Sequence, residues 1–197
     1  MLKAKPPNYR FCPFCGQPLK TKAEDGKIRS YCCSCNWTYY PHVASSAAAM
    51  IVKKNKVLMV RRARAPYLNT WMFPAGFVNF GEHPTETLAR EVLEETGLKV
   101  RIATLTEVLQ CEDDPRSQGH FQFFYKTTVC GTVKNLDDSE NSSIGWFDIA
   151  NPPQIGWKTH KIMMQRLQAV NRKRAQLGGG GGKVLSKPTN FDVAEKL

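Results

Sequence analysis

The chain has 197 residues, 42% of them hydrophobic, and carries a formal net charge of +11 at pH 7. This apolar content supports a packed core and excludes wholesale disorder, and no apolar run reaches the ~18 residues that suggest a membrane span. Residues 1–7 lack the apolar stretch of a signal peptide, so we expect a cytoplasmic protein with no membrane partner. The excess of positive charge favours anionic partners such as nucleotides, phosphorylated small molecules or nucleic acid.

Composition divides the chain into three regions. Residues 1–42 are rich in cysteine and aromatic residues, and residues 43–177 alternate strand-like and helix-like patterns. Residues 178–197 begin with five consecutive glycines, which form flexible linkers. We therefore expect a small N-terminal domain (1–42), a main domain (43–177) and a linker with a flexible tail (178–197).

Five of the seven cysteines lie within the first 35 residues, and four of them form two Cys-x2-Cys turns. Two such turns supply the four thiolates that Zn²⁺ prefers in a tetrahedral structural site. The predicted ligands are Cys12, Cys15, Cys32 and Cys35, and Cys33 is a surplus thiol. A redox pair, or a site that has lost its metal, is the alternative.

The middle region predicts strands mixed with two helices, as in an α/β sandwich. Pro84 suits the first turn of a helix and Gly97 suits its end, while residues 66–83 have the composition of a loop. Apolar residues at helical spacing predict a terminal helix. The expected elements are a hairpin of Ala48–Val52 and Lys56–Arg61, a helix at Pro84–Thr96, strands at Lys99–Leu109, Phe121–Val133 and Ile144–Ile149, and a helix at Thr159–Leu177.

Three glutamates of the first predicted helix project from a face that lies next to its apolar face. Glu91, Glu94 and Glu95 repel one another, and like charges at this spacing cost roughly 0.2–0.5 kcal/mol per pair. The clustering is notable in a chain with 28 basic and 17 acidic residues, and a divalent cation would reverse the repulsion. For the helix taken alone, a solvated charged face paired with Arg90 is the alternative.

The residues around this helix decide between a metal site and a solvated charged face. Gly76 is followed after five residues by Glu82 and after seven more by Arg90-Glu-Val-Leu-Glu-Glu-Thr-Gly-Leu98. This resembles the signature of the Nudix hydrolase family, G-x5-E-x7-R-E-U-x-E-E-x-G-U with U apolar, at every defined position. The resemblance implies an α/β/α sandwich with a mixed sheet and hydrolysis of a nucleoside diphosphate linked to another group.

The resemblance also implies roles for residues of the signature. Glu91, Glu94 and Glu95 would bind catalytic Mg²⁺ or Mn²⁺, and Glu91 or a nearby carboxylate would help to deprotonate the attacking water. Arg90 would orient a glutamate by ion pairing. The backbone carbonyl near Gly76 would be a further metal ligand, and Glu82 would be structural. Glu140 is another candidate metal ligand or base, with an ordinary loop glutamate as the alternative.

Substrate contacts are expected outside the signature. Arg61, Arg62 and Arg116 could hold phosphates, since guanidinium groups match phosphate geometry, and Phe80 could clamp a base. Solvated arginines are the alternative.

The cysteine segment resembles the zinc ribbon that precedes the catalytic domain in some family members, including NADH diphosphatases. The S-Q-P-W-P-F-P segment of those enzymes is absent, because residues 109–116 are Leu-Gln-Cys-Glu-Asp-Asp-Pro-Arg. Asp114-Pro115-Arg116 with Gly119-His120 is similar to a loop of ADP-ribose diphosphatases, apart from the inserted Ser117-Gln118. We therefore expect a small-molecule nucleotide substrate such as ADP-ribose or FAD.

Two other functions remain open. The protein could hydrolyse NADH or capped RNA, with the zinc ribbon contributing to nucleic-acid binding. It could instead be a non-catalytic nucleotide sensor or nucleic-acid-binding protein, although the intact glutamates argue against this. Similar proteins commonly form homodimers, but no feature of this sequence demonstrates one.

Overall fold

The computed structural model describes residues 9–117, 119–135 and 139–177. The chain divides into two compact units, Met1–Val43 and Ala44–Leu197, and each is described by itself. The expected flexible tail, residues 178–197, lies outside the described residues. Within the described ranges, no helix is long and apolar enough to cross a membrane.

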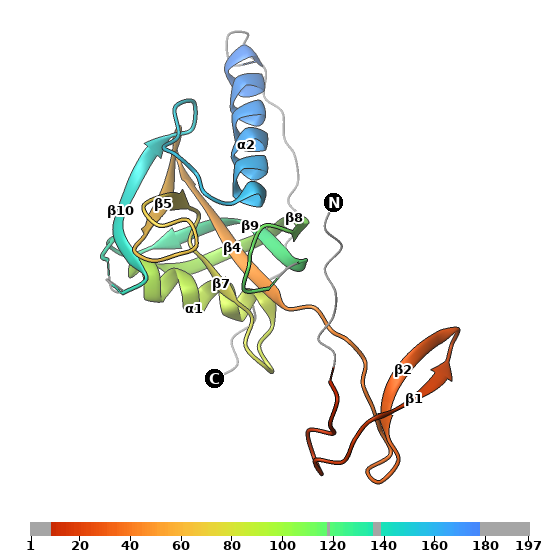
Figure 1. The fold of residues 1–197 in the computed structure, drawn as a ribbon. Coiled ribbons are helices and arrows are strands. Elements are labelled where there is room, and N and C mark those ends of the chain that lie inside the picture. The colour runs from red at the N-terminus through yellow and green to blue at the C-terminus, as the bar shows by residue number, and fades with distance from the viewer. Residues whose placement is uncertain (1–8, 118, 136–138, 178–197) are drawn as a thin grey trace. The chain divides into compact units, whose positions relative to one another are not determined.

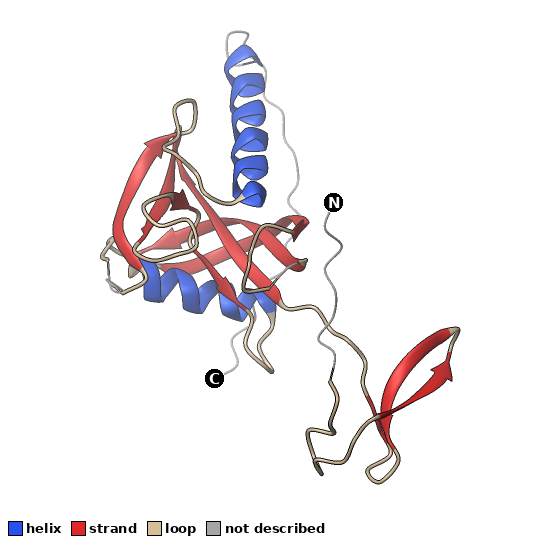
Figure 2. Cartoon of the chain, viewed as in Figure 1, coloured by secondary structure: helices blue, strands red, loops and turns tan. Residues whose placement is uncertain are grey.

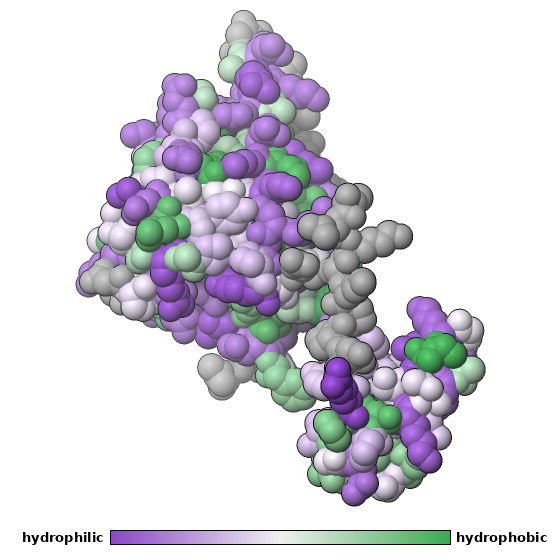
Figure 3. All heavy atoms as spheres, in the orientation of Figure 1, coloured by the Kyte–Doolittle hydropathy of each residue, from purple (hydrophilic) through white to green (hydrophobic). Residues whose placement is uncertain are grey.

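The smaller unit is a three-stranded antiparallel sheet of β1 (Lys20–Glu24), β2 (Lys27–Cys32) and β3 (Trp37–Thr38). Within residues 9–43, the buried side chains are those of two cysteines, Cys12 and Cys32. Apolar side chains such as Phe14 and Ile28 are exposed, and Figure 3 shows apolar patches on the surface of this unit. A unit of this size without an apolar core needs another cross-link to hold its fold.

The larger unit is built around a mixed sheet in the strand order β10-β5-β4-β9-β8. Strands β4 and β9 run parallel, whereas the other pairs are antiparallel, and the short strands β6 and β7 pair with β5 and β4. Figures 1 and 2 show a helix on each face of this sheet. The elements are β4 (Ser45–Lys53), β5 (Lys56–Arg62), β6 (Trp71–Met72), β7 (Ala75–Phe77), α1 (Pro84–Thr96), β8 (Lys99–Cys111), β9 (His120–Cys130), β10 (Asn141–Asp148) and α2 (Lys158–Leu177).

The central strand β4 divides the core into two layers because successive side chains point to opposite faces. Ala48 and Met50 pack with Met163 of α2. Ala47 and Ala49 pack instead with Leu88 of α1. Both faces of β4 are therefore buried, and the expected α/β/α sandwich is confirmed.

Helix α1 begins and ends where its sequence predicts. His83 is the N-cap and forms a capping box with Glu86, Pro84 occupies the first turn, and Gly97 ends the helix in the left-handed conformation. These signals fix the residues at which α1 starts and ends. They therefore also determine which of its glutamates lie against the sheet.

The segment 66–83, expected to be a loop, contains the two short strands β6 and β7. β6 pairs with β5 and β7 pairs with β4, so both are formed by tertiary contacts. A strand of two or three residues is too short to show the alternation that identifies strands in a sequence. β10 also starts earlier than expected, at Asn141, which brings this residue into the sheet.

His160 of α2 is fully buried and predicts a pH-dependent stability. Phe73 donates its backbone N–H to Nδ1 of His160 at 3.1 Å, and the Gln122 side-chain amide lies 3.0 Å from Nε2. Burial lowers the pKa of His160 from 6.5 to about 3, and the nearby Arg62 and His120 act in the same direction, opposed by Asp113.

Below pH 6.5 the unfolded chain therefore binds a proton at this histidine that the folded chain does not bind. We expect His160 to lower the free energy of unfolding by about 2 kcal/mol between pH 7 and pH 5. Urea unfolding of the wild type and of His160→Gln at both pH values measures the difference. An identical pH dependence in the two proteins would contradict this assignment.

Candidate active site

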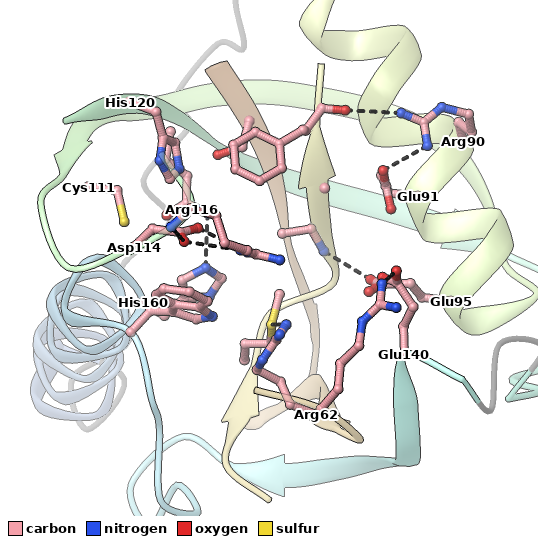
Figure 4. A pocket seen from close by; sticks show the side chains of 18 of the residues that line it. Arg62, Arg90, Glu91, Glu95, Cys111, Asp114, Arg116, His120, Glu140 and His160 are labelled. Atoms are coloured by element: carbon pink, nitrogen blue, oxygen red, sulfur yellow. Dashed lines mark hydrogen bonds and ion pairs between the residues drawn. The ribbon is translucent and has the colours of Figure 1, made fainter. Parts of the chain in front are cut away.

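The larger unit contains a cavity of about 320 Å³ between α1, β7 and the loops that flank β9 and α2. Figure 4 shows carboxylates and arginines from several elements facing this space. α1 and the segment after β8 each contribute both acidic and basic groups, β5 contributes a basic one, and the residue before β10 contributes an acidic one. The charged residues that line it are Arg62, Arg64, Arg90, Glu91, Glu95, Asp114, Arg116 and Glu140.

Glu95 is a buried acidic residue of α1, with 4% of its surface exposed. The Ala75 backbone N–H donates to one carboxylate oxygen at 2.9 Å, and the Asn141 side-chain amide donates to the other at 2.9 Å. Burial raises the pKa of Glu95 to about 8, and repulsion from Glu91 adds to this shift. The carboxyl group is thus held in place by two donors while its ionised form lacks a cationic partner.

Glu91 lies against the backbone of β7. Its carboxylate occupies the space that a Cβ atom at Gly76 would need, so the absence of a side chain at Gly76 admits it. Arg90 donates to Glu91 at 2.7 Å, yet burial raises the pKa of the Glu91 carboxyl group above its usual value. Glu91 and Glu95 therefore face the cavity on neighbouring turns of α1.

Arg90 connects the glutamates of the signature. Its guanidinium group donates to both oxygens of Glu82, at 2.8 and 3.0 Å, and to Glu94 at 3.1 Å. The side chain of Glu94 is 52% exposed and does not line the cavity. Glu82 also accepts a hydrogen bond from Thr87, which holds the loop before α1 in place.

The carboxylates that α1 directs to the cavity are chemically suited to hold a divalent cation. Carboxylates and backbone carbonyl groups are the ligands that Mg²⁺ and Mn²⁺ favour. Glu95 is buried and Glu91 is partly buried, and burial raises the pKa of both carboxyl groups because it disfavours their ionised forms. A cation between them would supply the missing positive charge, so the donor set fits such an ion.

The other side of the cavity carries arginines. Arg116 donates to both oxygens of Asp114, at 3.0 and 2.9 Å, and its guanidinium group lies 5.5 Å from the centre of the Phe77 ring. Arg64 pairs with Glu140 at the rim. Arg62 is buried and lines the same space.

The structure does not bring all the expected residues to this cavity. Arg61 neighbours Arg62 on β5 but does not line the cavity, and its Nε donates to the carbonyl oxygen of Asn69. Phe80 is fully exposed and also lies outside the lining.

Two contributors were missed by the sequence analysis. Asn141 anchors Glu95, and Asp114 holds Arg116. The acidic dipeptide before Pro115 was the signal available for Asp114, whereas Asn141 had none.

The smaller unit holds the four cysteines of the two Cys-x2-Cys turns together. Their sulfur atoms all lie within 4.8 Å of one another, and Cys15 Sγ lies 3.5 Å from Cys32 Sγ. Four converging thiols can hold a metal ion. Cys33 is exposed and is not part of the cluster.

The α/β/α sandwich encloses a cavity lined by both carboxylates and arginines, whose charges suit a cation and an anionic group. A model of the NUDIX domain matches residues 41–167, well over half of the chain. The chain belongs to the Nudix hydrolase family, whose members use divalent metal ions.

Individual relatives agree with this assignment. The chain is 32% identical over 133 residues to an ADP-ribose pyrophosphatase of Methanocaldococcus jannaschii, a match that covers 67% of this chain and 78% of that protein. It is 36% identical over 150 residues to the NAD-capped RNA hydrolase NudC of Chromobacterium violaceum, covering 75% of this chain and 53% of the relative. The chain thus spans about half the length of that hydrolase.

A solved Nudix hydrolase from Nitrosomonas europaea has the same fold, with a TM-score of 0.67 at 22% identity. That match covers 83% of this chain and 93% of the other.

Proposed function

We propose that this protein is a Mg²⁺- or Mn²⁺-dependent hydrolase that cleaves the diphosphate linkage of ADP-ribose or a related compound such as FAD. The observation that carries the proposal is a pair of carboxylates, the buried Glu95 and the partly buried Glu91, in one cavity with Arg62 and Arg116. The name of the archaeal relative, an ADP-ribose pyrophosphatase, supports the substrate class.

Each side chain has a role that follows from its contacts. Glu91, Glu95 and the backbone at Gly76 are the groups that would hold the cation, with Glu94 beside them on α1. When bound, the cation would neutralise phosphate charge and lower the pKa of a water molecule. Arg90 orients Glu91, while Glu91 or Glu140 accepts the proton of the attacking water.

Arg116 is positioned for the substrate rather than for the cation. Asp114 fixes its guanidinium group by two hydrogen bonds, so Arg116 keeps its orientation when the cavity is empty. A pre-oriented guanidinium binds a phosphate oxygen with little further loss of side-chain entropy. Arg61 and Phe80 are less suited to this role because they do not line the cavity.

The experiment that tests the proposal is a hydrolysis panel with and without Mg²⁺. It compares ADP-ribose, FAD, NADH, a nucleotide sugar, a dinucleoside polyphosphate and NAD-capped RNA. We expect cation-dependent release of two monophosphate products, with ADP-ribose or FAD giving the highest kcat/KM. Failure to hydrolyse any of them, with both Mg²⁺ and Mn²⁺ tested, would contradict the proposal.

A second candidate is hydrolysis of NAD-capped RNA. The similarity to the bacterial hydrolase favours it, as do the exposed aromatic rings of Phe11 and Phe14 and the exposed basic residues Arg10 and Lys20 in the same unit. Aromatic rings and positive charge are the features that bind single strands. A steep fall of RNA binding with salt would favour this candidate over a small-molecule substrate.

We further propose that the cysteine cluster binds a structural zinc ion. Because the unit buries hardly any apolar side chain, the metal would supply most of its folding energy. In Cys15→Ser we expect zinc content to fall from about one ion per chain to near zero, and residues 9–43 to become protease-sensitive while the larger unit stays folded.

The matched control is Cys33→Ser, which removes the surplus thiol and should retain zinc. Metal analysis and limited proteolysis of both variants give the measurement. Loss of zinc in Cys33→Ser alone, or its absence from the gently purified wild type, would overturn the zinc assignment.

A further inference from the structure

Trp157 is a buried aromatic residue of the cavity wall that contacts two arginines. It lies directly before α2, lines the cavity and is 5% exposed. The guanidinium carbons of Arg62 and Arg116 lie 5.5 Å and 5.7 Å from the centre of its ring. Both distances fall within the ~6 Å over which an aromatic face attracts a cation. Figure 4 shows that the two arginines reach the cavity from different parts of the chain, so Trp157 is a partner that they share.

The two arginines repel each other. Arg62 is buried, and the charge of Arg116 adds to the effect of burial in lowering the pKa of the Arg62 guanidinium group. Repulsion between like charges is stronger where water is excluded. An aromatic ring that attracts both cations offsets part of this repulsion. The position of Trp157 therefore affects where both guanidinium groups lie.

The ring of Trp157 packs against Tyr67, which belongs to the loop between β5 and β6. The two ring centres lie 4.5 Å apart in an edge-to-face arrangement. Gly156 permits this approach, because a Cβ atom there would lie 2.7 Å from Cβ of Tyr67. Tyr67 adopts the left-handed backbone conformation, with a φ of 61°, which is unfavourable for a bulky residue. Such a conformation persists only where surrounding contacts enforce it.

Asp113, in the segment after β8, supplies such a contact. Its Oδ2 accepts hydrogen bonds from the Tyr67 hydroxyl at 2.8 Å and from the backbone N–H of Lys158 at 3.0 Å. Lys158 follows Trp157 directly and is the first residue of α2.

Both side chains of the Tyr67–Asp113 bond keep the protonation state that it needs. Burial and the hydrogen bond to Asp113 raise the pKa of Tyr67 to about 12, so its hydroxyl remains a donor at neutral pH. Burial alone would raise the pKa of Asp113, but hydrogen bonds from Lys158, Tyr67 and Cys111 hold it below its usual value. Asp113 therefore stays ionised, and one carboxylate oxygen connects the residue packed on Trp157 with the residue that follows it.

We propose that Asp113 is a positioning residue that fixes Trp157 by joining the loop of Tyr67 to the start of α2. Trp157 in turn holds Arg62 and Arg116 in place beside the cavity. Asp113 acts through these residues, since neither it nor Tyr67 lines the cavity. This role rests on the proposed function, in which Arg116 meets the anionic substrate.

Replacing Asp113 by alanine should raise the KM for ADP-ribose by about 10-fold, the value of one hydrogen bond to a charged group. The value of kcat should change little, because the carboxylates that would hold the cation are untouched. Asp113→Asn should keep a KM near that of the wild type, since the amide oxygen can accept the same two hydrogen bonds. Tyr67→Phe removes one of these bonds and keeps the ring, so it should raise KM by a smaller factor.

A second readout follows Trp157 directly in the full chain. The protein is labelled with 5-fluorotryptophan, and the fluorine NMR signal that is missing from Trp157→Phe identifies this residue among the four tryptophans. The signal should shift or broaden in Asp113→Ala and keep its position in Asp113→Asn. A role confined to stability would lower the unfolding temperature but leave KM and this signal unchanged in the folded protein.

The matched control is Asp148→Ala. Asp148 also accepts a backbone N–H, from Ala150 at 2.8 Å, but lies outside the cavity lining, so this variant should keep the wild-type KM and signal. If Asp113→Ala does not fold, Tyr67→Phe takes its place. An unchanged KM in the folded variant, or a loss in Asp113→Asn equal to that in Asp113→Ala, would overturn the positioning role.

The positioning role and the proposed function can fail separately. If the hydrolysis panel failed but calorimetry showed that binding of ADP-ribose still depended on Asp113, the positioning role would stand and the proposed function would not. If hydrolysis proceeded with an unchanged KM in Asp113→Ala, the proposed function would stand and the positioning role would be wrong.

Discussion

Replacing Glu95 by glutamine should lower kcat for diphosphate hydrolysis by at least about 10²–10³-fold, the range seen when one preorganised electrostatic group is removed from an active site. Glu95 is buried at the cavity and its two oxygens are oriented by Ala75 and Asn141. An amide cannot provide the negative charge that a cation requires. Steady-state kinetics measures the loss of kcat, and electron paramagnetic resonance of bound Mn²⁺ measures the loss of cation binding.

The substitution should leave the protein folded. Glutamine has one oxygen for the two donors that face Glu95, so we expect a loss of about 1–3 kcal/mol in the free energy of unfolding. The matched control is Glu86→Gln on the same helix, since glutamine also serves in a capping box. Full activity of a folded Glu95→Gln protein would refute the role of this residue in cation binding.

The position of Glu95 shows what the helix pattern could and could not predict. Seven residues separate Leu88 from Glu95, so at about 100° per residue their side chains leave α1 within about 20° of each other. Glu95 therefore shares the buried face of α1, whereas the apolar residues Ala89 and Leu93 are exposed. Residue type alone therefore does not locate the buried face of this helix.

Arg61 and Arg62 show a second limit of what could be predicted from the sequence. Strand alternation predicts that Arg61 and Arg62 point to opposite faces of β5, but it does not tell which face borders the cavity. That depends on β6 and β7, whose pairing is tertiary. The same reason explains why Asn141 was missed, because its importance comes from a contact with Glu95, 46 positions away in the chain.

The contact between β7 and α1 makes Gly76 a sensitive position. Gly76 pairs with Ala47 of β4, and the Glu91 carboxylate lies directly against its Cα. A methyl group at Gly76 would overlap this carboxylate, which must then leave its position beside the backbone. We expect Gly76→Ala to reduce kcat by about 10²-fold or more, since it displaces a charge oriented for the cation.

A double-mutant cycle can assign this loss to Glu91. If the methyl group acts only by displacing that carboxylate, Gly76→Ala should have no further effect on kcat in a Glu91→Ala background. Stability should change little there as well, because removing the Glu91 side chain opens the space that the methyl group fills. Additive losses in kcat would instead mean that Gly76 acts through the backbone of β7, independently of Glu91.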